Sequence, residues 1–273
     1  MSLPEILGFG HSGRGVGVRD HQLILPSVVC STRVSRRIAA EVGAVTFAHQ
    51  HGCGIIGIDV AGIDDFFVDL ASHPNVGSVL IVSLGCETIQ GNELCAKIAR
   101  FNPSTQYIVI QESGGVEGAV AKGILLARVL ASQFKPSRQR IEELVVGIDF
   151  SRQIADPRAL VDALAKQGIT CISADQIHGC AKNFSTLMAQ KAQVILSFTS
   201  ENQPPTGFAL IPVINVASAS PLHNAIMGEF DLKSDATSEE IAALILKVAS
   251  GAKTISEANQ SGEIVAPRAV RSV

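Results

Sequence analysis

Apolar runs and helix-like segments alternate along the first half of this chain, and no other feature restricts its fold as strongly. The runs are continuous and rich in β-branched residues. Continuous runs are typical of strands buried on both faces, and helices between them indicate parallel βαβ units. We therefore predict an α/β fold with a parallel sheet. Its expected strands are residues 22–29, 44–49, 78–85, 106–111 and 144–150, and its expected helices are residues 31–42, 59–73, 92–101 and 118–134.

The second half repeats this alternation more weakly. A helix over residues 237–251 has the clearest signals, because Thr237 can cap its first turn, Glu240 follows three residues later and Gly251 can end it. We place the boundary near residues 151–157, which gives an α/β lobe over 1–150 and a smaller α/β lobe over 151–273. The other expected elements are helices at 157–167 and 183–191 and strands at 169–173, 193–199 and 209–216.

Composition and charge exclude several classes of protein. Hydrophobic residues make up 47% of the 273 residues and charged residues 17%, as in a compact globular chain. The net charge of −3 and the scattered basic residues argue against nucleic acid or a membrane as a partner. Six cysteines without a CxxC pair make a disulfide framework or a zinc knuckle a poor interpretation. We expect a cytoplasmic protein without an export leader or a membrane span.

Polar residues follow four successive apolar runs at the points where the expected strands end. In a parallel sheet these positions share the carboxyl edge, where ligands bind in open α/β folds. The sequence thus predicts thiol, imidazole, amide and carboxylate groups around one site. They are Cys30 after the first run, His49, His51 and Cys53 after the second, Cys86 and Glu87 after the third, and Gln111 and Glu112 after the fourth.

Glycine-bearing turns accompany these residues in "HGCG", "LGCE" and "ESGG". Glycine permits positive φ and close approach of a ligand, and the amino ends of helices attract carboxylates. Arg14 and Arg19, in "GRGVGVRDH", could hold a carboxylate with their planar guanidinium groups. The alternative stays open at this point: the glycines make tight turns, the cysteines are small buried residues, and both arginines are solvated.

Several of these segments resemble the catalytic large subunit of the altronate and galactarate dehydratases. The resemblance rests on "GRGVGVRDHQLILPSVVCSTRVSRRIA", "AHQHGCG", "HPNVGSVLIVSLGCETIQ" and "YIVIQESGG", in this order between Gly8 and Phe150. It returns more weakly over "AQVILSFTSENQPPTGFALIPVINV". The large subunit of sulfolactate sulfo-lyase is similar in the same pattern.

This resemblance implies a hydro-lyase that removes water from a sugar acid with the help of a divalent metal, iron(II) or manganese. It also implies a small partner subunit or a homo-oligomer. The metal would stabilise an enediolate, with His49 and Glu87 as ligands or acid–base groups and Cys86 as a softer ligand. The residues carried over are His49, Cys53, Cys86, Glu87 and Gln111 as catalytic or metal-binding groups, and Arg14, Arg19, Gly114 and Gly115 as substrate-binding groups.

The chain departs from the family pattern after its "LVVG" strand. Family members continue there with a cysteine, paired glycines, serine and aspartate, whereas this chain continues with "IDFSRQIADPRAL" and keeps Asp149 and Ser151. It resembles a shortened relative. A second hypothesis is therefore a catalytically impaired paralogue that binds a small acid or has a regulatory role.

Overall fold

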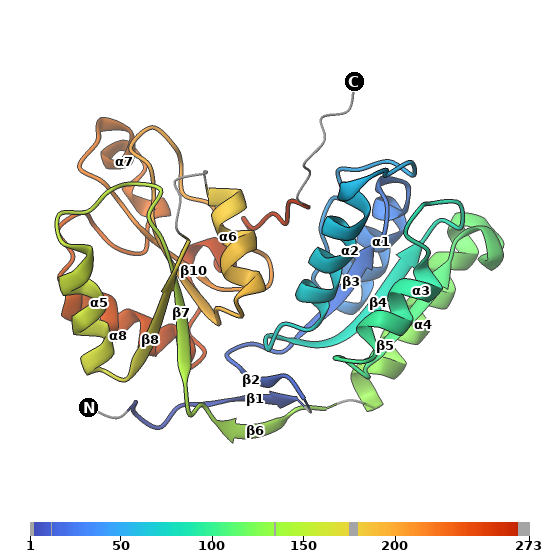
Figure 1. The fold of residues 1–273 in the computed structure, drawn as a ribbon, viewed down its shortest axis with the longest axis horizontal. Helices are drawn as coiled ribbons and strands as arrows, with labels where there is room; N and C mark the ends of the chain where they lie inside the picture. Colours follow the sequence, from blue (N-terminus) through green and yellow to red (C-terminus); the bar gives the residue numbers. More distant parts are fainter. Residues whose placement is uncertain (1–2, 12, 134, 175–179, 267–273) are drawn as a thin grey trace. The chain divides into compact units, whose positions relative to one another are not determined.

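The computed structural model describes residues 3–11, 13–133, 135–174 and 180–266, and the chain divides into two compact units (Figure 1). Unit 1 contains Met1–Phe9, Val16–Arg19 and Arg138–Glu263, and unit 2 contains Gly10–Gly15, Asp20–Ser137 and Ile264–Val273. Each unit has its own parallel sheet with helices packed against it. The predicted α/β class with parallel sheets is confirmed.

Unit 2 is built on the parallel strands β3 (His21–Pro26), β4 (Val76–Ser83) and β5 (Thr105–Val109), in the order β3-β4-β5. Every residue of the central strand β4 is buried, which explains its unbroken apolar sequence. The strand expected over 44–49 is reduced to one parallel bridge between Val45 and Leu23. Beyond this bridge, the Thr46 hydroxyl donates to Ile24 O and the His49 amide donates to Thr32 Oγ1, so side chains replace the sheet hydrogen bonds.

Two helices cover each face of this sheet. Helices α1 (Thr32–Val42) and α4 (Gly115–Gln133) pack together on one face, and α2 (Ile58–Ala71) and α3 (Gly91–Ile98) pack on the other. The core under α1 and α4 joins Ile24, Leu80, Val82 and Ile108 to the apolar faces of both helices.

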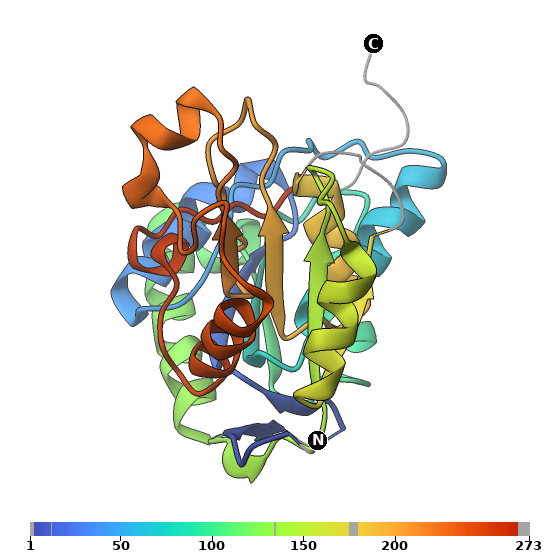
Figure 2. The ribbon, with the colours of Figure 1, turned by 90° about the vertical axis from the view of Figure 1, so that its left-hand side faces the viewer.

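Unit 1 contains a four-stranded parallel sheet in the order β10-β9-β7-β8. Helices α5 (Pro157–Lys166) and α8 (Ser238–Ala249) lie in front of this sheet in Figure 2, and α6 (Cys180–Ala189) contacts β7 and β9. The strand expected over 144–150 as the last of the first lobe is β7, and it pairs with β8 and β9 of unit 1. The strands are β7 (Leu144–Asp149), β8 (Ile169–Ser173), β9 (Val194–Phe198) and β10 (Val213–Val216).

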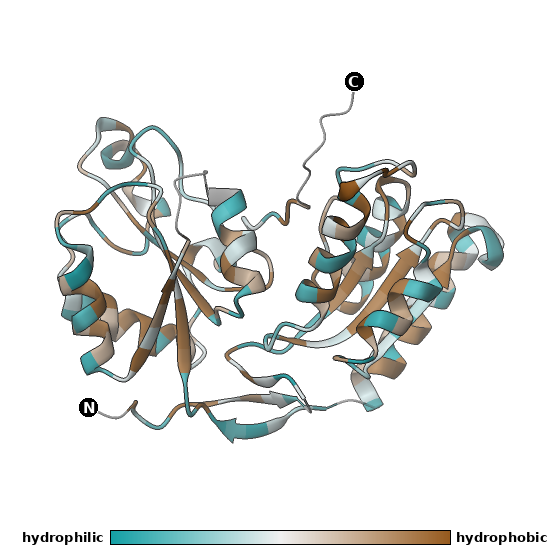
Figure 3. Ribbon diagram, in the orientation of Figure 1, coloured by the Kyte–Doolittle hydropathy of each residue, from teal (hydrophilic) through white to brown (hydrophobic). Residues whose placement is uncertain are grey.

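The hydropathy of the strands explains their burial, because the strands of both parallel sheets are largely hydrophobic (Figure 3). Helix α8 begins with the expected capping box, in which Thr237 and Glu240 exchange hydrogen bonds with each other's backbone. No helix in the described parts of the chain combines the length and apolar character needed to span a membrane.

The remaining strands and α-helices are short. The strands β1 (Leu7–His11), β2 (Gly15–Gly17) and β6 (Ser137–Arg140) form a small sheet of order β2-β1-β6. The short helices are α7 (Pro221–Ala225) and α9 (Ile255–Ala258).

Candidate functional site

The carboxyl ends of β3 and β4 form the topological switch point of unit 2. The chain leaves β3 toward α1 on one face of the sheet, and it leaves β4 toward α3 on the other. Connections that diverge in this way open a crevice between neighbouring strand ends, where open α/β folds bind their ligands. Here the two neighbouring strand ends are residues 27–30 and residues 84–87, and we call this edge of unit 2 the rim.

Glu87 fixes the turn on one side of the rim. It is only 3% exposed, and its carboxylate accepts hydrogen bonds from the Ser27 hydroxyl at 2.7 Å and from the amides of Leu84 and Gly85 at 2.9 and 2.6 Å. Burial works to raise the pKa of Glu87, but these hydrogen bonds outweigh it and lower the pKa below its usual value. The carboxylate thus ties the end of β3 to the turn after β4, and both of its oxygens are occupied in doing so.

Three cysteine thiols lie together at the rim. Cys30 and Cys86 are exposed and Cys53 is partly buried. The sulfur atoms of Cys30 and Cys53 are 4.0 Å apart, and the Cys86 thiol is near enough to Cys53 to influence its pKa. Burial, together with its two thiol neighbours, raises the pKa of Cys53 to about 11, so this thiol is protonated at neutral pH.

His49 is buried beneath the rim and does not face solvent. The imidazole is 2% exposed and contacts the rings of Phe47, His51 and Phe67. Its Nδ1 accepts a hydrogen bond from the His51 amide at 2.9 Å, and its Nε2 has no partner among the described residues. Burial lowers the pKa of His49 to about 4, with a smaller contribution from His51, so the ring is neutral at pH 7.

Gln111 and the glycine turns line the other side of the rim. The exposed Gln111 side chain lies against Gly85. Gly85 has a φ of +119°, and any side chain at this position would collide with the Gln111 amide. Gly114 and Gly115 both have positive φ and open space around them, and they lead into the amino end of α4. This stretch presents backbone that a ligand can approach closely.

The two arginines predicted to bind substrate do not lie at the rim. Both precede β3 in the chain, and a residue that precedes a parallel strand lies at the amino edge of the sheet. Arg14 donates to the carbonyls of Val76 and Gly77 where β4 begins. Arg19 forms a bidentate ion pair with Glu257 in unit 1, with N–O distances of 2.7 and 2.9 Å. Both guanidinium groups thus make structural contacts instead of contributing to the rim.

The predicted metal ligands His49, Cys86 and Glu87 do not fit a metal ion together. The His49 ring is buried, the Glu87 oxygens face backbone amides, and Cys86 is exposed. Within the described ranges, no group of three or more His, Cys, Asp or Glu side chains is arranged to hold a metal ion as it stands. The donors that lie closest together at the rim are thiols.

Contacts that the sequence analysis missed also shape the rim. The Gln50 side chain exchanges hydrogen bonds with Ile264 O and the Ala266 amide, and Ala266 O lies 3.2 Å from His51 Nε2. Residues 264–266 therefore pack on the loop that carries the histidines. They are distant in sequence and have no catalytic residue type, so only a three-dimensional structure could reveal them.

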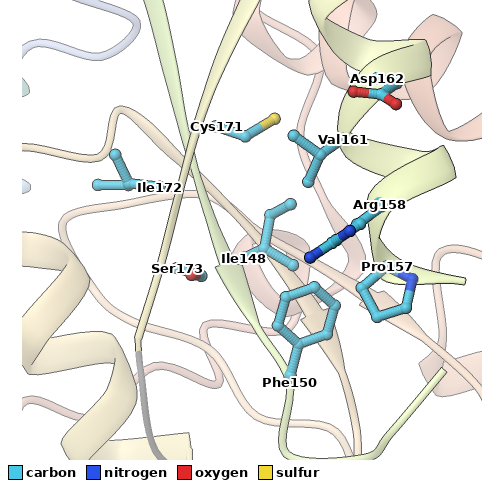
Figure 4. A pocket seen from close by; sticks show the side chains of 9 residues that line it. All are labelled: Ile148, Phe150, Pro157, Arg158, Val161, Asp162, Cys171, Ile172 and Ser173. Atoms are coloured by element: carbon cyan, nitrogen blue, oxygen red, sulfur yellow. The ribbon is translucent and has the colours of Figure 1, made fainter.

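A separate hollow lies in unit 1, at the carboxyl ends of β7 and β8 (Figure 4). Its volume is about 350 Å³, and its apolar side chains surround the Arg158 guanidinium. It lacks the grouped thiol, amide and glycine features of the rim. The lining residues are Ile148, Phe150, Pro157, Arg158, Val161, Asp162, Cys171, Ile172 and Ser173.

A known protein family matches the part of the chain that contains the rim. Residues 8–135 match the family model described as D-galactarate dehydratase/Altronate hydrolase, second domain. This segment belongs to that domain family. The predicted resemblance to altronate and galactarate dehydratases is thereby confirmed, and the Cys30, Cys53 and Cys86 thiols all lie inside the matched second domain.

Two altronate dehydratases show distant similarity that covers part of the chain. The Escherichia coli (strain K12) protein is 25% identical over 158 residues, which are 53% of this chain and 32% of that protein. The Bacillus subtilis (strain 168) protein is 27% identical over 156 residues, which are 52% of this chain and 31% of that protein. The chain therefore aligns with about a third of the length of each relative.

Proposed function

We propose that this chain is a hydro-lyase that removes water from a sugar acid or a related hydroxy acid bound at the rim. The observation that carries the proposal is the grouping of thiols, an exposed amide and open glycine backbone at the β3–β4 switch point, within the matched second-domain segment. Such an elimination takes a proton from the carbon next to the carboxylate and expels a neighbouring hydroxyl group. The resulting enol then tautomerises to a 2-keto-3-deoxy acid.

Three features of the rim suit a hydroxy carboxylate. The amino end of α4, entered through Gly114 and Gly115, provides backbone amides and the positive end of a helix dipole for the carboxylate. The Gln111 amide can both donate to and accept from substrate hydroxyl groups. Close approach is possible because the exposed glycines leave open space where side chains would otherwise stand.

Acid–base catalysis would require the His49 loop to move. His49 Nε2 is neutral and unpartnered among the described residues, which suits a proton acceptor, but the ring is buried under Phe47 and Phe67. A shift of residues 47–54 would bring this nitrogen to the rim. Substrate binding would have to drive that shift.

The buried position of His49 and the occupied carboxylate of Glu87 favour a second candidate function. Without that loop movement, the rim could bind a small hydroxy acid and leave it unchanged. The chain would then be a binding or regulatory module.

One experiment separates the two functions. The purified chain, reduced and supplied with iron(II) or manganese, is incubated with a panel of hexarates and hexonates and assayed for 2-keto-3-deoxy acids, while thermal shifts report binding. The lyase predicts product from at least one acid. Stabilisation by an acid without product supports the binding module, and neither product nor stabilisation across the panel contradicts both.

A matched pair of variants locates the activity. Gln111→Ala should lower kcat/KM, or the affinity for the acid, by about 10-fold, equivalent to roughly 1.4 kcal/mol. Gln106→Ala removes another exposed amide, near the start of β5 and so away from the carboxyl edge of the sheet, and should have no effect. Equal effects of the two substitutions would show that Gln111 has no specific role at the rim.

A further inference from the structure

Two backbone hydrogen bonds hold the loop of residues 46–57, which we call the Cys53 loop, across the rim. All of these residues are described, and they connect the bridge beside β3 to α2 without forming a helix or a strand. The Val29 amide donates to His51 O at 2.9 Å, and the Thr88 amide donates to Cys53 O at 3.0 Å. The first bond places the loop beside the end of β3, and the second places it beside the turn after β4.

This arrangement brings the thiols of Cys30 and Cys53 into contact. Their sulfur atoms are 4.0 Å apart, although the residues are 23 positions apart in the chain (53 − 30). Both cysteines are free, and Cys30 is exposed, so an oxidant in solution can reach its sulfur. A disulfide has sulfur atoms about 2.05 Å apart, so these two need to approach each other by about 2 Å.

The Cys53 loop can supply this approach. Rotation about the Cα–Cβ bonds of the two cysteines moves their sulfur atoms without moving the sheet. Gly52 and Gly54 flank Cys53 with open space around them, so the backbone on both sides of the thiol can adjust as well.

We propose that Cys30 and Cys53 form a reversible disulfide that locks the Cys53 loop onto the end of β3 when the chain meets a peroxide. The peroxide first converts the exposed Cys30 thiol to a sulfenic acid and leaves as one water. The Cys53 sulfur then attacks the Cys30 sulfur, and a second water departs as the disulfide forms. Two electrons and two thiol hydrogens pass to the peroxide in total. Two equivalents of a small thiol restore both cysteines and are themselves joined in a disulfide.

The lock would act on the reaction at the rim, and this consequence rests on the proposed hydro-lyase function. His49 lies in the same loop, and its Nε2 reaches the rim only when residues 47–54 shift. A covalent bond between Cys30 and Cys53 holds the loop to the end of β3 and opposes that shift. Oxidation therefore switches the elimination off, and a small thiol switches it on again.

Peptide mass mapping tests the disulfide without measuring turnover. The full chain, reduced and then freed of reductant, is treated with an equimolar amount of hydrogen peroxide, alkylated, and digested without reduction. We expect two peptides joined through Cys30 and Cys53, which dithiothreitol separates. Cys95 and Cys171 serve as internal controls that should be alkylated, because they lie on α3 and on β8 of unit 1.

Single substitutions identify the partners. Cys53→Ser should abolish the joined peptides and leave a Cys30 sulfenic acid that dimedone captures. Cys30→Ser, at an exposed position, should also abolish them and keeps the test decisive if Cys53→Ser fails to fold. The matched control is Cys86→Ser, which removes the third rim thiol and should leave the bond between Cys30 and Cys53 intact.

Hydrogen exchange tests the lock itself. Oxidation of the parent chain should slow amide exchange at residues 47–54, and the same treatment of Cys53→Ser should not. Turnover of a hydroxy acid, if the chain is a hydro-lyase, should be lost on oxidation and return with dithiothreitol.

Each part can be contradicted separately. Oxidation of Cys30 and Cys53 to separate sulfinic or sulfonic acids, or disulfides formed only between chains, would overturn the intramolecular bond. A complete disulfide that leaves exchange at residues 47–54 unchanged would overturn the lock. Turnover that persists in the fully oxidised chain would overturn the switch, whereas a chain without turnover would contradict the hydro-lyase and leave mass mapping and exchange to decide the disulfide.

Discussion

At the scale of single residues, Glu87 and His49 show how burial changes what a polar side chain can do. Both follow expected strands, and both are residue types that bind metals or transfer protons. In the folded chain, Glu87 accepts hydrogen bonds from Ser27 and two backbone amides, and His49 is enclosed by aromatic rings. Each therefore has a measurable effect on stability that is independent of any reaction.

Replacing Glu87 with glutamine should destabilise the chain by about 1–3 kcal/mol. The NH2 group that replaces one carboxylate oxygen cannot accept a hydrogen bond, so at least one of the donors from Ser27, Leu84 or Gly85 loses its partner in a buried turn. Urea unfolding at pH 7 measures the change. Glu41→Gln, at an exposed position of α1, should stay within about 0.5 kcal/mol of the parent chain. Equal stabilities of the two variants would show that the Glu87 hydrogen bonds contribute nothing.

His49 should make the chain less stable in mild acid. Its pKa is lowered from 6.5 to about 4 by burial, so the unfolded state takes up a proton first as the pH falls. The stability is complete above about pH 6.5 and is lost progressively toward pH 4, by about 3 kcal/mol at most. Comparing urea unfolding at pH 7 and pH 5 in the parent chain and in His49→Gln isolates this effect. The loss should be smaller in the variant, and an unchanged pH dependence would contradict the assignment.

At the scale of helices and strands, local sequence patterns predicted where the elements lie, but they did not predict every pairing between strands. The strands β3, β4 and β5 could be predicted because their apolar residues are continuous. The segment after Val45 could not, because its side chains replace the sheet hydrogen bonds. The strand β7 could be located but not paired, since its apolar sequence suits either sheet. The positions of Arg14 and Arg19 could have been predicted, because both precede a parallel strand.

The capping box of α8 gives a test at this scale. Thr237→Ala removes the side-chain acceptor for the Glu240 amide and should cost about 1 kcal/mol of stability. The neighbouring Ser238→Ala changes the first residue of the helix, where no capping hydrogen bond is lost, and it should have a smaller effect. Urea unfolding of both variants measures the difference. A larger loss for Ser238→Ala would place the helix start elsewhere.

At the scale of the whole molecule, the sequence predicted the edge of the sheet that carries the candidate site, but not which side chains reach it. Cys30, Cys53, Cys86 and Gln111 are at the rim, whereas His49 is beneath it and Arg14 and Arg19 contribute to other parts of the fold. Strand ends follow from the order of elements along the chain. The direction of each side chain depends on the short turns beyond them, whose hydrogen bonds the sequence does not reveal.

The central claim is that a hydroxy acid binds at the rim of unit 2, and hydrogen exchange of the full chain with and without a hexarate tests it most directly. We predict slower amide exchange at residues 27–30, 84–87 and 111–117 when the acid is present, and unchanged exchange at residues 14–20. Protection confined to residues 14–20, or to the hollow beside Arg158, would contradict the claim.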